Sequence, residues 1–330
     1  MTNSFYKNKV ILITGGTGSF GSGFIRYLLK NANPKKIIVF SRDEFKQFYL
    51  QKEFEAHGEK LRFFLGDIRD LRRLERAMNG VDLVVHAAAL KQVPALEYNP
   101  SEAIQTNILG TQNVIDAAIS RNIKHVLLIS TDKAAEPINL YGATKMCAEK
   151  LFIASNVYTA GSTKFGAVRY GNVIGSRGSI VETILKSKEG PVHITHEQMT
   201  RFWLTLDSTF KLVTFALQSM VGGEMFIPKA SSMSVVDMFE AIAPGRERKI
   251  MGLRPGEKIH EVLLTEDEAM RSLDLGDYFV VLPHSNSTLS AERYEKYRKS
   301  GKKLSPGFKF QSDSNDKWIT KQEFSALLKK

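Results

Sequence analysis

A tyrosine and a lysine four residues apart stand near the middle of the chain, in the segment Tyr141-Gly-Ala-Thr-Lys145. On a helix, residues at this spacing share one face. An ammonium beside a phenol stabilises the phenolate and lowers the tyrosine pKa toward the range in which it can act as a base toward an alcohol. The same pattern also arises around a tyrosine that only packs, so its context has to decide between the two.

That context is a regular alternation of apolar segments and helical patterns along the first half of the chain. The predicted strands are Lys9–Thr14, Lys36–Phe40, Leu61–Leu65, Leu83–His86 and His125–Ser130, and the predicted helices between them include Phe20–Leu29, Asp43–Ala56 and Leu71–Met78. Strands that are apolar on both faces and separated by helices indicate a parallel sheet covered on both sides. We therefore expect an α/β, Rossmann-like, doubly wound fold, with Ser130-Thr131-Asp132-Lys133 closing the fifth strand just before Tyr141.

The alternation loosens after about Tyr170, where only short strand-like pieces such as Val192–Thr195 and Glu224–Ile227 remain. We expect residues 1–170 to form a dinucleotide-binding domain to which later segments return. Residues 171–330 should form mainly a smaller substrate lobe and a basic tail. The last forty residues carry eleven Lys and Arg against five Asp and Glu. They fit a solvated surface helix and tail, with anion docking or a subunit contact as the alternative.

Composition narrows the class of protein. With 43% hydrophobic and 25% charged residues in 330, the chain fits a globular protein and neither a disordered nor a collagenous one. The formal charge of +11 asks for an anionic partner: nucleic acid, a membrane surface or phosphorylated small molecules. One cysteine, Cys147, excludes an internal disulfide, and no apolar run reaches membrane-span length, so we expect a cytoplasmic protein without membrane contact. The histidines at 193, 196 and 260 lack a ligand spacing, and no metal is expected.

Glycines at 15, 18 and 21 lie between the first strand and its helix. Glycine permits the tight turn, lets the backbone approach a pyrophosphate and lets helix and strand pack closely, and the free N–H groups at the helix start attract negative charge. Because this turn opens a repeating β/α series, we interpret it as a dinucleotide cradle rather than a merely structural turn.

The end of the second strand indicates which dinucleotide binds. Ser41, Arg42 and Lys46 suit a 2′-phosphate, so we expect NADP, whereas Asp43 is the residue that would favour NAD. Asp67 would offer an acceptor to the adenine amino group, and three alanines after strand four would leave room for a flat ring. The residues expected to contact the cofactor are Gly15, Thr17, Gly18, Ser19, Phe20, Gly21, Ser41, Arg42, Asp43, Lys46, Asp67, Ile68, Ala87, Ala88, Ala89, Lys91, Ser130, Tyr141, Lys145 and Val173.

Taken together, these motifs resemble the extended short-chain dehydrogenase/reductases that remodel nucleotide sugars. Within that superfamily the chain is most similar to the inverting UDP-N-acetylglucosamine 4,6-dehydratases that open pseudaminic acid synthesis. The resemblance covers nearly the whole chain and rests on TGGTGSFG at 14–21, SRDE at 41–44, GDIRD at 66–70, HAAALKQVP at 86–94, STDKA at 130–134, YGATK at 141–145, RYGNVIGSRGS at 169–179, MTRFW at 199–203 and RPGEK at 254–258. Ordinary retaining dehydratases carry Thr-Asp-Glu where this chain has Thr131-Asp132-Lys133, which makes the lysine the discriminating residue.

The resemblance implies a reaction without net redox change. Tyr141 would take the proton of the sugar 4-hydroxyl as hydride passes to the nicotinamide, and the resulting ketone acidifies the hydrogen on carbon 5. Lys133, if neutral, would remove that hydrogen, and Asp132, if protonated, would protonate the departing 6-hydroxyl. Hydride then returns to carbon 6, and a proton reaches carbon 5 from the opposite face. We expect burial to shift both pKa values, with Lys145 pushing that of Lys133 down. The alternative to a catalytic role is that Asp132 and Lys133 form an exposed ion pair at the end of the strand.

The substrate implied is UDP-N-acetylglucosamine, and its expected contacts come from the second half of the chain. They are Lys91, Asn172, Arg177, Gly178, Ser179, Val181, His193, Thr195, Met199, Arg201, Arg254 and Glu257, with the arginines at 201 and 254 as the diphosphate and ribose candidates. The family implies a homo-oligomer, a dimer or a hexamer. Two rival enzymes remain, a retaining dehydratase and a C4 epimerase. A third reading is a non-catalytic NADP-sensing or RNA-binding protein, although no RNA module with stacking aromatics is visible.

Overall fold

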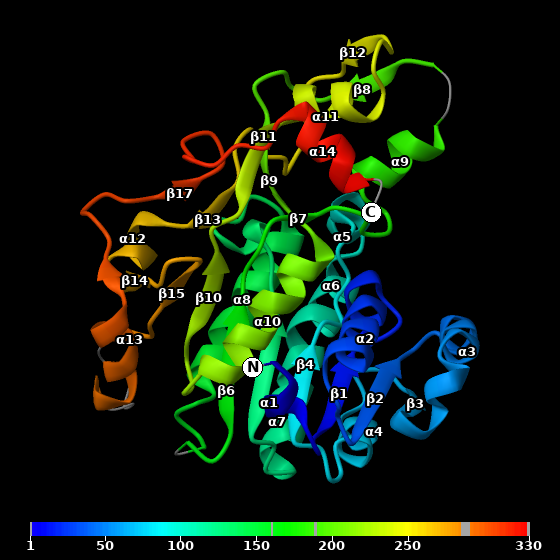
Figure 1. Ribbon diagram of the computed structural model, residues 1–330, viewed down its shortest axis with the longest axis vertical. Coiled ribbons are helices and arrows are strands. Elements are labelled where there is room, and N and C mark those ends of the chain that lie inside the picture. The colour runs from blue at the N-terminus through cyan, green and yellow to red at the C-terminus, as the bar shows by residue number, and fades with distance from the viewer. Residues whose placement is uncertain (1, 160, 188–189, 285–290, 329–330) are drawn as a thin grey trace.

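The computed structural model describes residues 2–159, 161–187, 190–284 and 291–328. Within these ranges its centre is a ten-stranded sheet in the order β16-β14-β15-β10-β6-β5-β4-β1-β2-β3 (Figure 1). The strands of this sheet are β1 (Val10–Thr14), β2 (Lys36–Ser41), β3 (Leu61–Leu65), β4 (Leu83–His86), β5 (His125–Ile129), β6 (Lys164–Val168), β10 (Met225–Pro228), β14 (Ser272–Asp274), β15 (Tyr278–Val281) and β16 (Lys302–Lys303).

The first strands are parallel, with β1 at the point where the strand order reverses. It pairs with β2 on one side, Leu12 opposite Ile38, and with β4 on the other, Leu12 opposite Val84. All three side chains are buried because helices cover both faces of the sheet. The predicted doubly wound fold is therefore confirmed, and each of the five predicted strands is present within one residue of its expected bounds.

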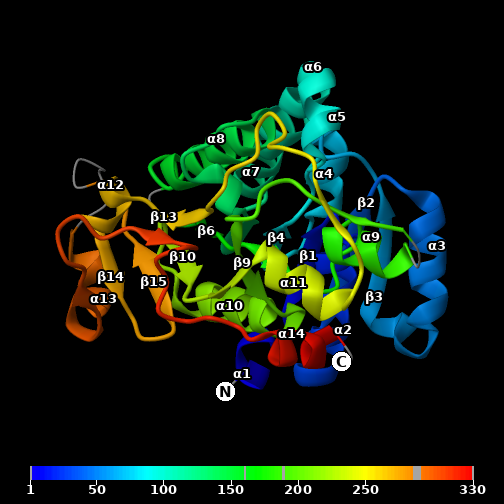
Figure 2. The ribbon, with the colours of Figure 1, turned by 90° about the horizontal axis from the view of Figure 1, so that it is seen from above.

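Helices lie on both faces of this sheet. The larger ones are α2 (Ser19–Asn31), α3 (Glu44–Glu53), α4 (Leu71–Ala77), α7 (Gly110–Ser120), α8 (Leu140–Ala154) and α10 (Leu206–Ser219). Seen from above, α7 and α8 lie on one face and α2 and α10 on the other (Figure 2). On the second face, Phe210 of α10 packs against Phe20 and Phe24 of α2 at ring distances of 5.8 and 5.6 Å. The absent side chain of Gly23 leaves the room that the Phe210 ring occupies.

Shorter elements connect these or build a second lobe, which stands above the carboxyl ends of the parallel strands (Figure 1). The shorter helices are α1 (Thr2–Tyr6), α5 (Val93–Tyr98), α6 (Pro100–Ala103), α9 (Ile180–Lys186), α11 (Val235–Ile242), α12 (Glu266–Ala269), α13 (Glu295–Ser300) and α14 (Lys321–Leu328). The remaining strands are β7 (Asn172–Val173), β9 (Thr200–Leu204) and β11 (Ser231–Ser234) in one sheet, β8 (Val192–Ile194) with β12 (Arg248–Ile250), and β13 (Val262–Leu264) with β17 (Phe310–Gln311). The 3-10 turns are Glu55–Lys60, Asp132–Ala134 and Ala291–Tyr294, and Ile104–Leu109 is a π-helical turn.

The segment around Glu224–Ile227 is one of the later segments that return to the main sheet, because β10 pairs in parallel with β6. The expectation for the tail needs correction. The basic tail is not simply a solvated surface, because Phe310 and Phe324 are buried and Phe324 packs on Trp203 at a ring distance of 5.0 Å. The apolar residues of the tail, rather than its lysines, determine where it lies. Lys329 and Lys330 lie outside the described residues.

Among the described residues, no helix is both long and apolar enough to cross a membrane. Over the same ranges, no group of three or more His, Cys, Asp or Glu side chains is placed to hold a metal ion.

Candidate active site

Three glycines turn the chain from β1 into α2 and keep the backbone of this turn open. Gly15 has a φ of 66°, and a Cβ there would lie 2.9 Å from the backbone of Ala88. A Cβ on Gly21 would lie 2.6 Å from the carbonyl oxygen of Gly15. Gly18 is the N-cap of α2, and no side chain caps the first amides of that helix. These free N–H groups at a helix N-terminus are suited to bind a phosphate.

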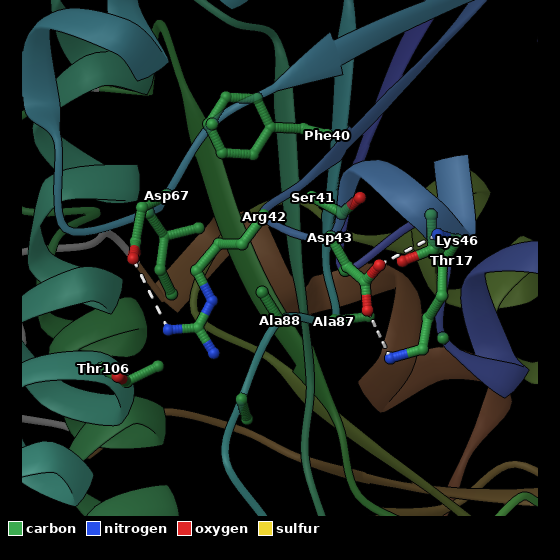
Figure 3. A pocket seen from close by; sticks show the side chains of 15 residues that line it. Thr17, Phe40, Ser41, Arg42, Asp43, Lys46, Asp67, Ala87, Ala88 and Thr106 are labelled. Atoms are coloured by element: carbon green, nitrogen blue, oxygen red, sulfur yellow. Dashed lines mark hydrogen bonds and ion pairs between the residues drawn. The ribbon is translucent and has the colours of Figure 1, made fainter. Parts of the chain in front are cut away.

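A cavity of about 300 Å³ lies beside this turn, across the carboxyl ends of β1, β2, β3 and β4 (Figure 3). Its lining is Gly15, Thr17, Gly18, Phe40, Ser41, Arg42, Asp43, Lys46, Gly66, Asp67, Ile68, Ala87, Ala88, Ala89 and Thr106. This volume is at the lower end of small-molecule sites, about 300–1,000 Å³, and suits one nucleoside end of a dinucleotide. The hydroxyl of Thr106 is buried there without a hydrogen-bond partner among the described residues, so the wall offers an unused polar atom. The residues thus fit a dinucleotide cofactor.

Most of the predicted cofactor residues line this cavity, and several do not. Those outside its lining are Ser19, Phe20, Gly21, Lys91, Ser130, Tyr141, Lys145 and Val173. Thr106 lines the cavity but was missed from the sequence. It lies in the π-helical turn that precedes α7, and no motif marks it.

The hydroxyl of Ser41 is oriented by Gln47, a buried residue of α3 that the sequence did not single out. The amide of Gln47 donates to the Ser41 hydroxyl at 3.0 Å, to the Ser41 carbonyl at 3.1 Å and to the Phe64 carbonyl at 2.9 Å. Because the hydroxyl oxygen of Ser41 accepts this bond, its own proton remains available to donate to a ligand oxygen.

Asp43 has a local structural role at the start of α3. It is the N-cap of that helix, accepts from the backbone N–H of Lys46 at 2.9 Å and pairs with the Lys46 ammonium at 2.7 Å (Figure 3). The hydrogen bonds and charge of Lys46 hold the pKa of Asp43 below its usual value. Arg42 extends in the other direction and reaches Asp67 at 3.5 Å, with half of its side chain exposed. The cavity therefore presents a partly free guanidinium beside Ser41.

A loop of the second lobe lies over the glycine turn. The backbone N–H of Arg177 donates to the Ser19 hydroxyl at 2.9 Å, and its guanidinium donates to the Thr17 carbonyl. The ammonium of Lys91 donates to the Arg177 carbonyl at 3.1 Å. Arg177 was predicted to contact substrate; the structure places it on the cofactor cradle, where it links the two parts of the molecule.

A cluster of chemically active side chains lies at the end of β5. The ammonium of Lys133 lies 3.0 Å from Oδ1 of Asp132, which also accepts from the Thr131 hydroxyl at 2.9 Å. Asp132 is 1% exposed, and its backbone N–H donates to the Tyr170 carbonyl at 3.0 Å. The alternative of an exposed ion pair is excluded for Asp132, since its carboxylate is fully inside the protein.

Glu261 completes this cluster and was missed from the sequence. Its Oε1 lies 3.3 Å from the ammonium of Lys133 and 3.7 Å from Nε of Arg201, and the residue is 2% exposed. It lies 128 positions after Lys133, just before β13, and no recognised motif includes it. Only the packing of β13 against the turn Asp132–Ala134 brings the two side chains together.

Lys133 was expected to have a lowered pKa and a neutral amine, and its surroundings favour the opposite. Burial lowers the pKa of Lys133, but the carboxylates of Asp132 and Glu261 outweigh burial and hold it above the ordinary lysine value. The nearby cation that opposes them is Arg201, not the predicted Lys145. In this arrangement Lys133 is an ammonium, because two carboxylates favour its charged form.

Tyr141 and Lys145 lie on the first turns of α8, as their spacing predicts, but the predicted electrostatic pairing is wrong. Burial raises the pKa of Tyr141 to about 12, and the cation that opposes this shift is Lys133. The Tyr141 hydroxyl is hydrogen-bonded to Thr131. Lys145 instead donates to the Ile129 carbonyl at 2.8 Å, and burial lowers its pKa to about 8. The tyrosine therefore shares its surroundings with the Asp132–Lys133 pair.

A buried histidine connects the cradle to the sheet. His86 at the end of β4 contacts the hydroxyls of Thr14 at 2.7 Å and Thr111 at 3.0 Å. Because Thr111 donates its proton to the Asn107 carbonyl, it accepts from Nε2 of His86, and Nδ1 accepts from Thr14. Burial lowers the pKa of His86 to about 3, which keeps the ring neutral.

A buried arginine attaches helix α8 to the second lobe. Arg169 is 2% exposed and donates to both oxygens of Glu149 on α8, at 3.0 and 2.7 Å. It also donates to both oxygens of Glu268 on α12, at 2.7 and 2.8 Å, and to the Leu263 carbonyl of β13. This clamp fixes the helix of Tyr141 relative to the strand that follows Glu261.

Three predicted substrate contacts need correction. Val181 and Met199 are 1% and 2% exposed in the core of the second lobe, so their side chains support the lobe rather than face a ligand. The guanidinium of Arg201 is committed to the carbonyls of Thr200, Lys258 and Ile259, which leaves it little capacity for a diphosphate.

The other predicted substrate residues occupy loops and short strands of the second lobe. Arg254 and His193 are exposed, and Asn172 and Thr195 are half-buried. Ser179 is the N-cap of α9, where it accepts from the Glu182 backbone, and Gly178 donates its N–H to the Glu182 carboxylate. Glu257 has one buried carboxylate oxygen without a partner. Their contacts with a ligand stay predictions.

Comparison with known proteins gives a consistent relationship. A family model described as "Polysaccharide biosynthesis protein" matches residues 11–283. The chain is 44% identical over 331 residues to a Campylobacter jejuni protein named UDP-N-acetylglucosamine 4,6-dehydratase (inverting), with 98% of each chain covered. It is 38% identical to a protein of Rickettsia conorii named UDP-glucose 4-epimerase, with 98% of this chain and 96% of that one covered. Among solved structures, Pen from Bacillus thuringiensis matches with a TM-score of 0.87 at 38% identity, with 98% of both chains covered.

Proposed function

The chain belongs to the polysaccharide biosynthesis protein family, within the extended short-chain dehydrogenase/reductases, and on this premise we propose that it is an NADP-dependent UDP-N-acetylglucosamine 4,6-dehydratase that inverts carbon 5. The observation that carries the proposal is the contact between Lys133 and the buried carboxylate of Asp132, beside Tyr141. A dehydratase needs an acid for the leaving hydroxyl and a base for the adjacent carbon, and this pair supplies one group of each kind.

Each of these side chains has a defined task in that reaction. Tyr141 takes the proton of the sugar 4-hydroxyl, and the bound nicotinamide supplies reversible hydride transfer. Lys133 removes the proton from carbon 5, which the 4-ketone has acidified. Asp132 gives a proton to the oxygen on carbon 6, which leaves as water. The product is UDP-2-acetamido-2,6-dideoxy-β-L-arabino-hex-4-ulose, which we place at the first step of pseudaminic acid synthesis.

The resting charges of Lys133 and Asp132 are opposite to those that the reaction requires, and proton transfer between the two groups can reverse them. The Lys133 ammonium and Oδ1 of Asp132 are 3.0 Å apart, within hydrogen-bond distance. Transfer of one proton across this contact produces a neutral amine and a protonated carboxyl together, without any change in the net charge of the pair. The base and the acid are therefore produced in a single step.

NADP is favoured over NAD by the residues at the end of β2. Ser41 has a free proton to donate, and Arg42 offers a partly exposed guanidinium on the same edge of the cavity. Asp43, the residue that would favour NAD, is already engaged as the N-cap of α3 and as the partner of Lys46. A guanidinium and a hydroxyl together suit a 2′-phosphate, whereas a free carboxylate would repel it.

Incubation with UDP-N-acetylglucosamine in deuterated water tests this function. We expect a 4-keto-6-deoxy product with deuterium at carbon 5 and an inverted configuration there, read by NMR. A deuterated product with retained configuration would indicate a retaining dehydratase. Absence of any 6-deoxy product would contradict the proposal.

A C4 epimerase is the second candidate, favoured by the 38% identity to the Rickettsia conorii protein named UDP-glucose 4-epimerase. An epimerase has no leaving hydroxyl at carbon 6 and needs neither Asp132 nor Lys133 as acid and base. The same incubation separates the two, because an epimerase forms UDP-N-acetylgalactosamine with no deuterium at carbon 5.

A further inference from the structure

Glu261 places a second buried carboxylate on Lys133. Its Oε1 lies 3.3 Å from the ammonium, almost as near as Oδ1 of Asp132 at 3.0 Å. The other oxygen of each carboxylate, Oε2 of Glu261 and Oδ2 of Asp132, is buried and has no hydrogen-bond partner within the described ranges. Buried carboxylate oxygens are ordinarily satisfied, so this cluster holds unused acceptor capacity on both sides of one amine.

The backbone of Glu261 is held in place from both sides. Its N–H donates to the Ser312 hydroxyl and its carbonyl accepts from the Ser312 N–H, both at 2.9 Å. The Ser312 hydroxyl also contacts the hydroxyl of Thr200 at 2.6 Å, and Thr200 contacts Nδ1 of His260 at 2.9 Å. Ser312 follows β17, which pairs with β13. The tail therefore fixes the residue that reaches Lys133.

Stability alone does not account for two carboxylates on one ammonium. Burying a second carboxylate costs several kcal/mol, whereas the Lys133 side chain is 29% exposed and already has Asp132 as an ionic partner. The charged and titratable groups that act on Lys133 are Asp132, Glu261 and Arg201, and Tyr141 and Lys258 also lie within its electrostatic influence. Among the residues that the structure describes, only Asp132 and Glu261 form an ion pair with the amine. Asp132 is occupied by the acid role, which leaves the task of Glu261 to be identified.

We propose that Glu261 is a positioning residue: it anchors the Lys133 amine by a second ionic contact, keeps it charged in the resting enzyme, and is the contact that weakens when Lys133 acts as a base. This inference rests on the proposed dehydratase function, in which Lys133 removes the proton from carbon 5. With Glu261 in place, transfer of the proton to Asp132 leaves the amine beside a carboxylate that still favours its charged form. Glu261 therefore sets the pH above which the neutral amine becomes available.

Replacement of Glu261 by Gln removes the charge and keeps the size. We expect the acid limb of the pH profile of kcat to move to lower pH by at least one unit, about a tenfold change in proton affinity, because the neutral amine forms more easily. In Glu261→Asp, which keeps the charge, the acid limb should lie close to its position in the wild type. The Kd for NADP should not change in either variant, since Glu261 does not line the cofactor cavity.

Glu136→Gln is the matched control. Glu136 also pairs with a lysine, Lys309 at 2.9 Å, but its side chain is half-exposed and forms no ion pair with Lys133 in the described part of the chain. The Glu136→Gln variant should leave the acid limb of the kcat profile unchanged. If the limb of Glu261→Gln also stays in place while its melting temperature matches that of wild type, Glu261 is merely structural and the proposal is wrong.

A second measurement needs neither a variant nor activity. Competitive acetylation of the lysines of the NADP-bound protein across pH, read by mass spectrometry, reports the proton affinity of each amine separately. Lys133 should become reactive at higher pH than Lys309, because two buried carboxylates contact it rather than one exposed carboxylate. Reactivity of Lys133 at the same or a lower pH would overturn the role of Glu261. A wild-type enzyme that forms no dehydrated sugar would instead contradict the proposed function and leave this comparison valid.

Discussion

Gly142 lies directly against the carbonyl oxygen of Lys133, and the space between them cannot hold a Cβ. Helix α8 begins at this point, with Asn139 as its N-cap accepting from the Gly142 N–H at 2.7 Å. The first turn of α8, which carries Tyr141, is thereby packed onto the turn that carries Asp132 and Lys133. The glycine of the Tyr-x-x-x-Lys segment is what allows the two halves of the acid–base cluster to approach.

Gly142→Ala should therefore damage the site more than the cofactor cavity. The added methyl forces α8 away from Lys133, so we expect kcat to fall by at least about a hundredfold, a size typical for misplacement of about 1 Å. The free energy of unfolding should fall by about 1–3 kcal/mol, as is usual for overpacking. Turnover of UDP-N-acetylglucosamine, NADP titration and urea unfolding measure these effects. Gly58→Ala, at a position with nothing within 4 Å, is the control and should leave all three unchanged.

Lys133→Ala should keep the fold and cofactor binding and lose dehydration. The amine is the proposed base, and no other described lysine contacts Asp132. Deuterium exchange at carbon 5 and release of water should both disappear, as followed by NMR of the sugar. Lys309→Ala, which breaks a surface ion pair, should retain the activity. An unchanged sugar product from Lys133→Ala would contradict the assignment of Lys133 as the base.

Arg42→Ala should weaken NADP binding selectively. Loss of a charge-assisted hydrogen bond costs about 1.5–3 kcal/mol, so the Kd for NADP should rise by about ten- to a hundredfold, whereas that for NAD should change little. Titration calorimetry with both dinucleotides measures the two constants. Arg72→Ala, an exposed arginine on α4, serves as the control. A wild-type protein that binds NAD as tightly as NADP would show that this edge does not hold a 2′-phosphate.

His86 should make the protein sensitive to acid. Burial lowers the pKa of its ring to about 3, below the ordinary value of 6.5. Between these values the unfolded chain binds a proton that the folded chain does not, so stability is complete above about pH 6.5 and is lost as pH falls toward 3. The contribution of His86 to the free energy of unfolding is on the order of 5 kcal/mol. Protonation would also place a hydrogen on Nδ1, which accepts from Thr14.

Urea unfolding at several pH values tests this dependence. His86→Asn should be less stable than wild type at pH 7, because the ring stacks on Phe152 at 5.9 Å, but its stability should decline less between pH 6.5 and 4. His57→Asn, at an exposed histidine, should keep the slope of wild type. An equally steep decline in His86→Asn would assign the acid sensitivity to other groups.

Local patterns were sufficient to predict the sheet and the cradle. Strands such as Leu83–His86 are apolar on both faces because both faces are covered, and glycines at 15 and 21 are the residues that a close turn tolerates. Nearly all residues that line the cofactor cavity come from the turns that follow β1, β2, β3 and β4, and these parallel neighbours end at one edge of the sheet. Sequence spacing therefore predicted most of them.

The electrostatics of the acid–base cluster could not be predicted in this way. The spacing of Tyr141 and Lys145 correctly places both on one helix, but burial directs the lysine to the Ile129 carbonyl and leaves Lys133 as the cation near the phenol. The predicted fall in the pKa of Lys133 depended on a neighbour close in sequence. Its actual neighbours include Glu261 and Arg201, which lie on segments far along the chain.

By itself, the sequence determined the doubly wound fold and the glycine turn of the cofactor cradle, because alternating apolar and helical segments and the spacing of the glycines are local patterns. Its family motifs marked Asp132, Lys133 and Tyr141 as candidates for chemistry. Only the tertiary structure decided that Lys133 rests as an ammonium, that Arg201 is engaged by backbone carbonyls, and that Ser312 in the tail positions Glu261. Charge states and side-chain partners depend on distances between segments that are remote in sequence, and folding alone sets those distances.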